Sequence, residues 1–134
     1  MSFMIRAELR NLQMSARKAR RVIDIVRGRP VDEALALLQF TPNAAAKPTR
    51  KLIASAVANA EENYGLVADE LFVAEIMAGP GRTRKAGRFG ARGRFKPELH
   101  RSCHVTVGLR EINPEPIPGV DDESESVAEA AEEN

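Results

Sequence analysis

The 134-residue sequence contains no tryptophan, one tyrosine and one cysteine, and aromatic residues make up only 4% of it. A buried core must therefore be mostly aliphatic. A lone cysteine cannot form an internal disulfide, and a zinc site needs about four ligands. No apolar run reaches the roughly 18 residues that span a bilayer, and the N-terminus lacks the pattern of a signal peptide. These absences favour a single small cytosolic domain without a membrane segment.

Charge is distributed unevenly along the chain, although the net charge is only +1. All 20 Lys and Arg residues lie in residues 1–110 with 10 of the 19 acids, which gives this part a net charge of +10. The other nine acids lie in residues 111–134, which hold no base. Such asymmetry is typical of a nucleic-acid-binding body followed by an acidic tail. We expect a domain over residues 1–112 and a disordered acidic tail over residues 113–134.

Hydrophobic periodicity predicts a mixed fold. Period-two alternation indicates strands, and apolar residues spaced three to four apart indicate helices. Ser15 is a plausible N-cap, Gly28 a plausible helix stop, and Pro48 predicts either a helix start or a bend. In chain order the patterns predict a strand over 3–10, helices over about 15–28, 30–41 and 44–63, and strands over 71–77 and 99–109.

A glycine-rich basic segment separates the last two predicted strands. Residues 78–98 contain five glycines and only one acid, Glu98. With almost nothing to bury, the segment is either disordered or a protruding hairpin arm that reaches roughly 35 Å. Phe89 and Phe95 could stack on unpaired bases or simply pack within a hairpin. Guanidinium groups match phosphate oxygens, so the segment's seven bases favour a polyanion over a merely solvated loop: Arg82, Arg84, Lys85, Arg88, Arg92, Arg94 and Lys96.

A second basic surface is predicted on the first helix, opposite its apolar face. Asp24 is the only acid between Arg17 and Arg29, whereas an ion-paired solvated face would carry more acids at helical spacing. We therefore favour phosphate binding over simple solvation for the bases of this face: Arg17, Lys18, Arg20, Arg21, Arg27 and Arg29.

Other polar residues give no catalytic or metal signature. His100 and His104 would lie about 13 Å apart on one strand, too far for a shared metal. Cys103 falls on the apolar parity of its strand and is expected in the core. No nucleophile–base pair is evident, and we expect no metal, no cofactor and no catalytic residue. Adjacent acids are interpreted as surface pairs: Glu61 with Glu62, and Asp69 with Glu70.

Several segments together resemble one known family. Residues 15–20 (SARKAR) and 55–63 (SAVANAEEN) resemble helix motifs of the bacterial large-subunit ribosomal protein family numbered twenty-two. Residues 91–94 (ARGR) and 104–107 (HVTV) resemble its arm and its last strand. The resemblance covers about residues 4–110.

The resemblance implies an α+β fold: three helices packed on a small antiparallel sheet, with a long protruding basic β-hairpin at about residues 78–98. It implies a non-enzymatic, cytoplasmic constituent of the large ribosomal subunit that binds its RNA and supports assembly. It also implies that the hairpin helps line the nascent-polypeptide exit tunnel. Expected partners are large-subunit rRNA, neighbouring ribosomal proteins around the tunnel and the nascent polypeptide near the hairpin tip. Neither a membrane nor a second copy of the chain is expected as a partner.

The residues carried over by position as rRNA-facing come from the helices, the arm tip and the last strand: Arg17, Lys18, Arg20, Arg27, Asn59, Asn63, Arg92, Gly93, Arg94, Arg101 and His104. Further basic residues complete the expected rRNA-binding set: Lys51, Arg82, Arg84, Lys85, Arg88 and Lys96. Two other functions stay as alternatives. One is a DNA-architectural protein whose basic arm enters the minor groove, and the other is a hydrolase with perturbed carboxylates.

Overall fold

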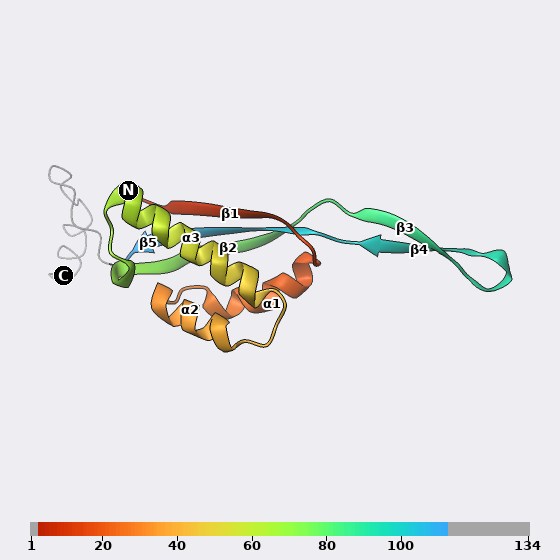
Figure 1. The fold of residues 1–134 in the computed structure, drawn as a ribbon, viewed down its shortest axis with the longest axis horizontal. Coiled ribbons are helices and arrows are strands. Elements are labelled where there is room, and N and C mark those ends of the chain that lie inside the picture. Colours follow the sequence, from red (N-terminus) through yellow and green to blue (C-terminus); the bar gives the residue numbers. More distant parts are fainter. Residues whose placement is uncertain (1–2, 113–134) are drawn as a thin grey trace, which may run out of the picture.

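A computed structural model describes residues 3–112 of the chain. It confirms the predicted α+β class: three helices pack on a small antiparallel sheet, and a hairpin arm projects far beyond the body (Figure 1). The predicted tail, residues 113–134, lies outside the described residues. The elements in chain order are β1 (Ile5–Leu12), α1 (Ala16–Val26), α2 (Val31–Phe40), α3 (Ala46–Tyr64), the 3-10 turn η1 (Ala68–Glu70), β2 (Leu71–Pro80), β3 (Arg84–Phe89), the 3-10 turn η2 (Ala91–Gly93), β4 (Phe95–His100) and β5 (Cys103–Glu111).

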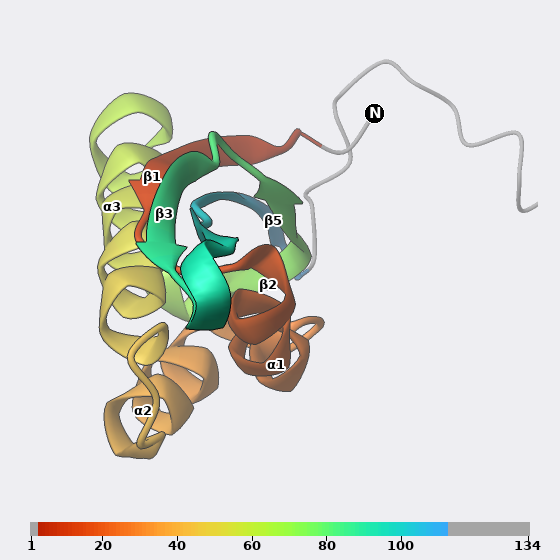
Figure 2. The same cartoon turned by 90° about the vertical axis from the view of Figure 1, so that its right-hand side faces the viewer.

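The body sheet has the order β1-β5-β2, with the last strand in the centre and antiparallel to both neighbours. All three helices lie on one side of this sheet, as the view along the arm in Figure 2 shows. Alternate residues of β5 point to opposite faces. Val105, Val107 and Leu109 are buried, whereas His104 and Thr106 are half-buried on the other face. The period-two pattern in the sequence therefore marks the helix-facing side of the sheet.

The core is aliphatic, as the composition requires. Its largest fully buried side chains are isoleucines, leucines and valines from all three strands and from the three helices, and no aromatic side chain of residues 3–112 belongs to it. Burying each such side chain contributes about 1.5–3 kcal/mol. The predicted apolar face of α1 is confirmed in full, because the four residues assigned to it are all buried: Ala19, Val22, Ile23 and Val26.

Helix α3 resolves the two interpretations of Pro48. The helix begins at Ala46, so Pro48 is its third residue and the helix does not bend there. The first four N–H groups of a helix have no intrahelical acceptor, and the missing N–H of proline therefore costs no helical hydrogen bond. At the other end, Gly65 adopts a left-handed conformation (φ 66°) and its N–H caps the carbonyls of Ala60 and Glu61.

The single strand predicted over residues 99–109 was wrong. Strand β4 ends at His100 and β5 begins at Cys103, with Arg101 and Ser102 between them. The apolar alternation continues in phase across this break, but the two halves have different partners: β4 pairs with β3 in the arm, and β5 pairs with β1 and β2 in the body. Leu99, expected on the core face, is therefore 45% exposed in the arm. The predicted arm began at about residue 78, but β2 continues to Pro80. The paired strands of the arm begin at Arg84 and end at His100.

The outer edge of β2 is occupied by groups from α1 and the turn that follows it. The amide of Gly28 donates to the Val73 carbonyl at 2.8 Å, and the Val73 amide donates to the Arg29 carbonyl at 2.9 Å. Further along the edge, the Arg27 Nη2 donates to the Ile76 carbonyl at 3.0 Å, and the Arg20 guanidinium donates twice to the Ala78 carbonyl, at 3.2 and 3.1 Å. An edge strand with satisfied polar groups is a poor template for pairing with another chain.

We predict that Arg27→Ala destabilises the body by about 1–2 kcal/mol, because it removes a charged hydrogen bond to the half-buried Ile76 carbonyl. Urea unfolding measures the change. Arg21→Ala, an exposed cation on the same helix without a hydrogen bond to the described residues, serves as the control and should cost less than 0.5 kcal/mol by the usual ranges. Equal losses in the two variants would contradict a role for Arg27 at this edge.

Candidate nucleic-acid interface

The arm has two chemically distinct faces. Register pairs Arg84 with His100, Ala86 with Glu98 and Arg88 with Lys96, so these residues share one face of the hairpin. Like charges lie opposite each other at Arg88 and Lys96, an unfavourable arrangement in a sheet. The Arg88 Nε contacts the Glu98 carboxylate at 2.9 Å and partly offsets that repulsion. This face is strongly basic and nearly without acids.

The opposite face of the arm is mainly apolar and aromatic, with Lys85 near its root. Lys85 pairs with Leu99, and Pro97 and the cross-strand pair Phe89 and Phe95 follow toward the tip. The Phe95 ring fills the space where Gly87 would carry a Cβ, since an atom built there would lie 2.0 Å from the ring. Phe95 therefore packs within the hairpin, one of the two roles considered for it, yet stays 69% exposed, while Phe89 is 93% exposed.

The arm tip places cations on a tight turn. Turn η2 contains Arg92 and Gly93, both with positive φ (59° and 69°). The side chains of Arg92 and Arg94 are exposed. Because the tip has no buried residue, its shape depends on the backbone turn and on whatever surrounds it.

The root of the arm is held by a short set of hydrogen bonds. The Gly81 amide donates to the Ser102 carbonyl at 2.8 Å, and the Ser102 hydroxyl donates to the Arg82 carbonyl at 2.6 Å. A Cβ at Gly81 would lie 2.8 Å from the Ser102 Oγ and 3.1 Å from the His104 Nε2, so only glycine fits there without a shift. These contacts join β2 and β5 where the chain leaves the body.

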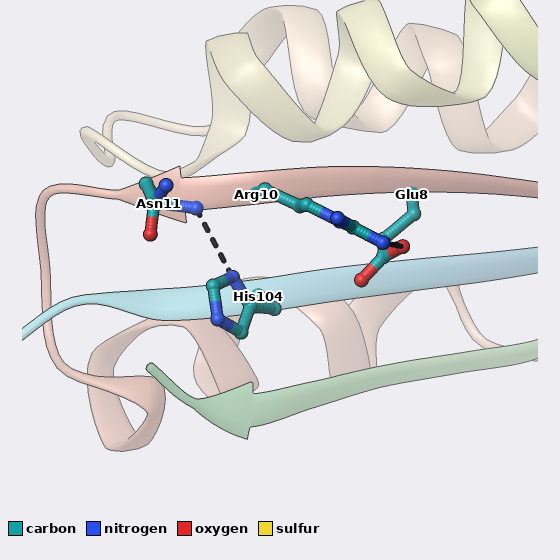
Figure 3. A network of polar contacts seen from close by, with 4 residues as sticks. All are labelled: Glu8, Arg10, Asn11 and His104. Atoms are coloured by element: carbon teal, nitrogen blue, oxygen red, sulfur yellow. Dashed lines mark hydrogen bonds and ion pairs between the residues drawn. The ribbon is translucent and has the colours of Figure 1, made fainter. Parts of the chain in front are cut away.

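His104 has a structural partner at this root. Its Nδ1 accepts the backbone N–H of Asn11 at 3.1 Å (Figure 3). Asn11 has a positive φ of 56° at the bulge of β1, a conformation that asparagine tolerates better than most residues. The neighbouring Arg10 forms an exposed ion pair with Glu8 at 3.0 Å (Figure 3). The histidine therefore fixes the end of β1 against β5.

Helix α1 and the arm root enclose an open cleft of about 690 Å³, here called the root cleft. Five cations line it, and among the described residues no acid does. The cations come from the start of α1 and from the linker between β4 and β5, about 80 positions apart in the chain: Arg17, Lys18, Arg20, Arg21 and Arg101. The fold thus brings Arg101, which follows the basic arm segment in the chain, beside the basic face of α1.

A second cleft, of about 800 Å³, lies beside the arm root and is here called the arm cleft. It is lined by Asn11, Gln13 and a basic stretch of the arm with His100, again without an acid among the described residues. Its cations are Arg82, Arg84 and Lys85. Ser102 lines both clefts, so the hydrogen bonds of the arm root lie between them.

The remaining predicted site residues are spread over the body. The guanidinium groups of Arg20 and Arg27 donate to β2 carbonyls, a use that the sequence pattern did not indicate. Asn59 and Asn63 are hydrogen-bonded to each other on α3. Lys51 lies in a separate groove between α3 and β1, together with Glu8. Arg21, left out of the carried-over set, lines the root cleft, and its place on the basic face of α1 was the signal for it.

The two groups with shifted pKa values do not line these clefts. Burial raises the pKa of the Cys103 thiol, an effect that nearby Arg20 partly reduces, so the thiol stays protonated in the core as expected. A hydrogen bond with Asp69 raises the pKa of exposed Asp32, a pairing between α2 and η1 that the sequence did not reveal.

Within residues 3–112, no three His, Cys, Asp or Glu side chains are grouped as metal ligands. No helix in that range is long and apolar enough to cross a membrane.

A small α+β body thus carries two cation-lined clefts and a basic arm, a surface whose charge suits a polyanionic partner. The family model for ribosomal protein L22p/L17e matches residues 7–110. Among similar proteins, the large ribosomal subunit protein uL22 of Lactobacillus delbrueckii subsp. bulgaricus is 46% identical over 108 residues, covering 81% of this chain and 92% of that protein. The protein of the same name from Synechococcus sp. (strain JA-3-3Ab) is 46% identical over 111 residues, covering 83% and 90%.

The chain therefore belongs to the ribosomal protein L22p/L17e family, which confirms the resemblance seen in its motifs. This is a family of structural ribosomal proteins and not of enzymes, so the hydrolase alternative is excluded.

We predict that Gly81→Ala destabilises the protein by about 1–3 kcal/mol, because the added methyl group overpacks the arm root. Gly79→Ala is the matched control, since no atom lies within 4 Å of a Cβ at that position. Thermal unfolding and amide hydrogen exchange of residues 81–84 and 100–102 report the change. If Gly79→Ala is as costly as Gly81→Ala, the close packing of the root is not what holds the arm.

Proposed function

We propose that this chain binds large-subunit ribosomal RNA through the root cleft, the arm cleft and the basic face of its arm. As a member of its family, it is a structural constituent of the large ribosomal subunit and acts in the cytoplasm. Its place in translation follows from that membership. What the proposal adds is the surface that meets the RNA and the part each basic residue plays.

The observation that carries the proposal is the convergence of five cations on one cleft that no acid of residues 3–112 lines. Held together in water, these charges repel one another, and a phosphate chain relieves the repulsion and releases its own counterions. Arg17 and Arg101 approach the cleft from different elements, so a phosphate between them would be held from two sides. Arginine suits this geometry because its planar fork can bind two phosphate oxygens at once.

Residues outside the root cleft extend the proposed contact. Arg20 and Arg27 each use part of the guanidinium on a β2 carbonyl and present the remaining N–H groups toward RNA. Asn59, Asn63 and Lys51 supply polar and basic contacts from α3, and His104 offers its Nε2 edge beside Gly81. On the arm, we assign close approach of the RNA backbone to Gly93. We assign phosphate contacts to the basic residues of the arm: Arg82, Arg84, Lys85, Arg88, Arg92, Arg94 and Lys96.

The arm is proposed to extend along the nascent-polypeptide exit tunnel, with its tip among ribosomal RNA and near the nascent chain. From Gly81 to Arg92 the chain could span about 36 Å at the usual rise of a strand, a length that suits deep insertion. The basic face would meet RNA, and the exposed ring of Phe89 offers a surface for stacking on an unpaired base. Neighbouring ribosomal proteins around the tunnel are proposed to contact the body, which acts as one copy per subunit.

We predict that Arg17→Gln combined with Arg101→Gln weakens binding to large-subunit rRNA and reduces its salt dependence. Two lost phosphate contacts should lower the slope of log K against log salt by about 1.4–1.8. Fluorescence anisotropy over a series of salt concentrations measures the slope. The pair Lys47→Gln and Arg50→Gln changes the net charge equally but lies on α3 outside the root cleft. A slope that falls as much in this control pair would sink the assignment of the cleft.

We also predict that Arg92→Glu combined with Arg94→Glu weakens rRNA binding by at least tenfold, because reversed charges at the tip repel phosphates. Cosedimentation of each variant with reconstituting large subunits gives a direct readout. Wild-type incorporation of the double variant would mean that the tip lies away from the RNA backbone. Preference of the wild-type chain for duplex DNA over folded rRNA would instead support the DNA-architectural alternative.

A further inference from the structure

We propose that the acidic segment of residues 113–134 binds the root cleft of its own chain when RNA is absent. In this state the segment would shield the cleft and compete with RNA of low affinity. The inference goes beyond the proposed function but shares its cleft, and it requires only that the cleft binds anionic groups. The group that would occupy the cleft is therefore residues 113–134 of the same chain.

Charge complementarity is the first support. The root cleft is lined by five cations and, within the described residues, by no acid. Residues 113–134 carry no base and eight acids: Glu115, Asp121, Asp122, Glu123, Glu125, Glu129, Glu132 and Glu133. The two charge sets are of opposite sign and similar size. At low ionic strength, such sets attract over about 10–30 Å.

Several acids lie near the start of this segment, although Arg110 is also close by. The Ile112 amide donates to the Glu70 carbonyl at 2.7 Å, which fixes the end of the body beside turn η1. Asp69 and Glu70 belong to this turn, and the nearby Asp69 raises the pKa of the Asp32 carboxyl on α2, so several carboxylates lie near this end of the body. An acidic segment is repelled there and is favoured on a cationic surface elsewhere.

The chain length allows the segment to reach the cleft. Strand β5 runs from the arm root to the opposite end of the body (Figure 1), and Ser102 and Ile112 are ten residues apart, about 33 Å at the rise of a strand. The first acidic cluster begins at Asp121, nine residues after Ile112, which allows a reach of about 30 Å. The acids beyond it can therefore meet the cations of the root cleft.

Binding within one chain sets the size of the effect. A tethered ligand has an effective concentration of the order of 1 mM. If the untethered segment binds with a Kd of about 0.1–0.5 mM, the cleft is occupied most of the time and competing RNA binds about three- to tenfold more weakly. An RNA with many contacts displaces the segment, whereas a short unrelated RNA does not. The bound segment would thus increase the preference of the chain for an RNA with many contacts over short unrelated RNAs.

The first test needs no RNA. Backbone amide spectra of the full chain at low salt are compared with those of a variant of equal length in which the eight acids are changed to Gln or Asn. We expect differences at Arg17, Lys18 and Arg101, no differences at Lys47 and Arg50 on α3, and loss of the differences at about 0.5 M salt. Spectra that agree throughout the cleft would overturn the proposal, as would differences confined to other surfaces.

The second test measures competition. A single-stranded uridine 20-mer at low salt should bind the variant in which the eight acids of residues 113–134 are changed about three- to tenfold more tightly than it binds the wild-type chain. In the background of Arg17→Gln with Arg101→Gln this gain should shrink to less than twofold, while the Lys47→Gln and Arg50→Gln background should retain it. An equal gain in both backgrounds would reveal only a general charge effect and would overturn the proposal.

The two proposals fail separately. If the cleft amides respond to the acidic segment but the cleft variant binds large-subunit rRNA normally, the RNA assignment is wrong and the intramolecular contact stands. If the cleft variant loses rRNA binding and the cleft amides do not respond to the segment, the RNA assignment stands and the intramolecular contact is wrong.

Discussion

The structure depends on holding a charged arm that has no core of its own. An isolated two-stranded hairpin is marginal in water, and here the strands carry opposed cations at Arg88 and Lys96. The arm is anchored where β2 and β5 leave the body, at the hydrogen bonds between Gly81, Ser102 and Arg82. Because β5 is the central strand of the body sheet, this anchor rests on the most deeply buried part of the fold. The buried apolar faces of the body thus stabilise a surface that could not form alone.

Basic side chains serve two purposes on one helix. Arg20 and Arg27 of α1 satisfy carbonyls along the outer edge of β2, and Arg17 and Lys18 face the root cleft beside Arg101. The same helix therefore protects the sheet edge against unwanted strand pairing and supplies four of the five cations of the root cleft. Net charge conceals this basic surface, because the nine acids after residue 110 nearly cancel the charge of +10 carried by residues 1–110.

Local patterns in the sequence predicted the elements well, and long-range contacts explain the rest. Alternation identified β1 and β5, a run of mostly apolar residues identified β2, and the apolar stripe of α1 is buried as expected. The sequence did not predict the break between β4 and β5 at Arg101 and Ser102, because the alternation stays in phase while the pairing partner changes. The meeting of Arg17 with Arg101, and the bond from Asn11 to His104, join residues more than 80 positions apart. No local spacing encodes such contacts, so the clefts became visible only in the folded chain.

The most direct test of this account is a high-resolution structure of the large ribosomal subunit that contains this chain. The account predicts rRNA phosphates within about 3 Å of both Arg17 and Arg101 in the root cleft, in the range of charge-assisted hydrogen bonds. It also predicts an arm that continues the line of β2 and β5 into the RNA. A root cleft open to solvent, or an arm folded back on the body, would contradict it.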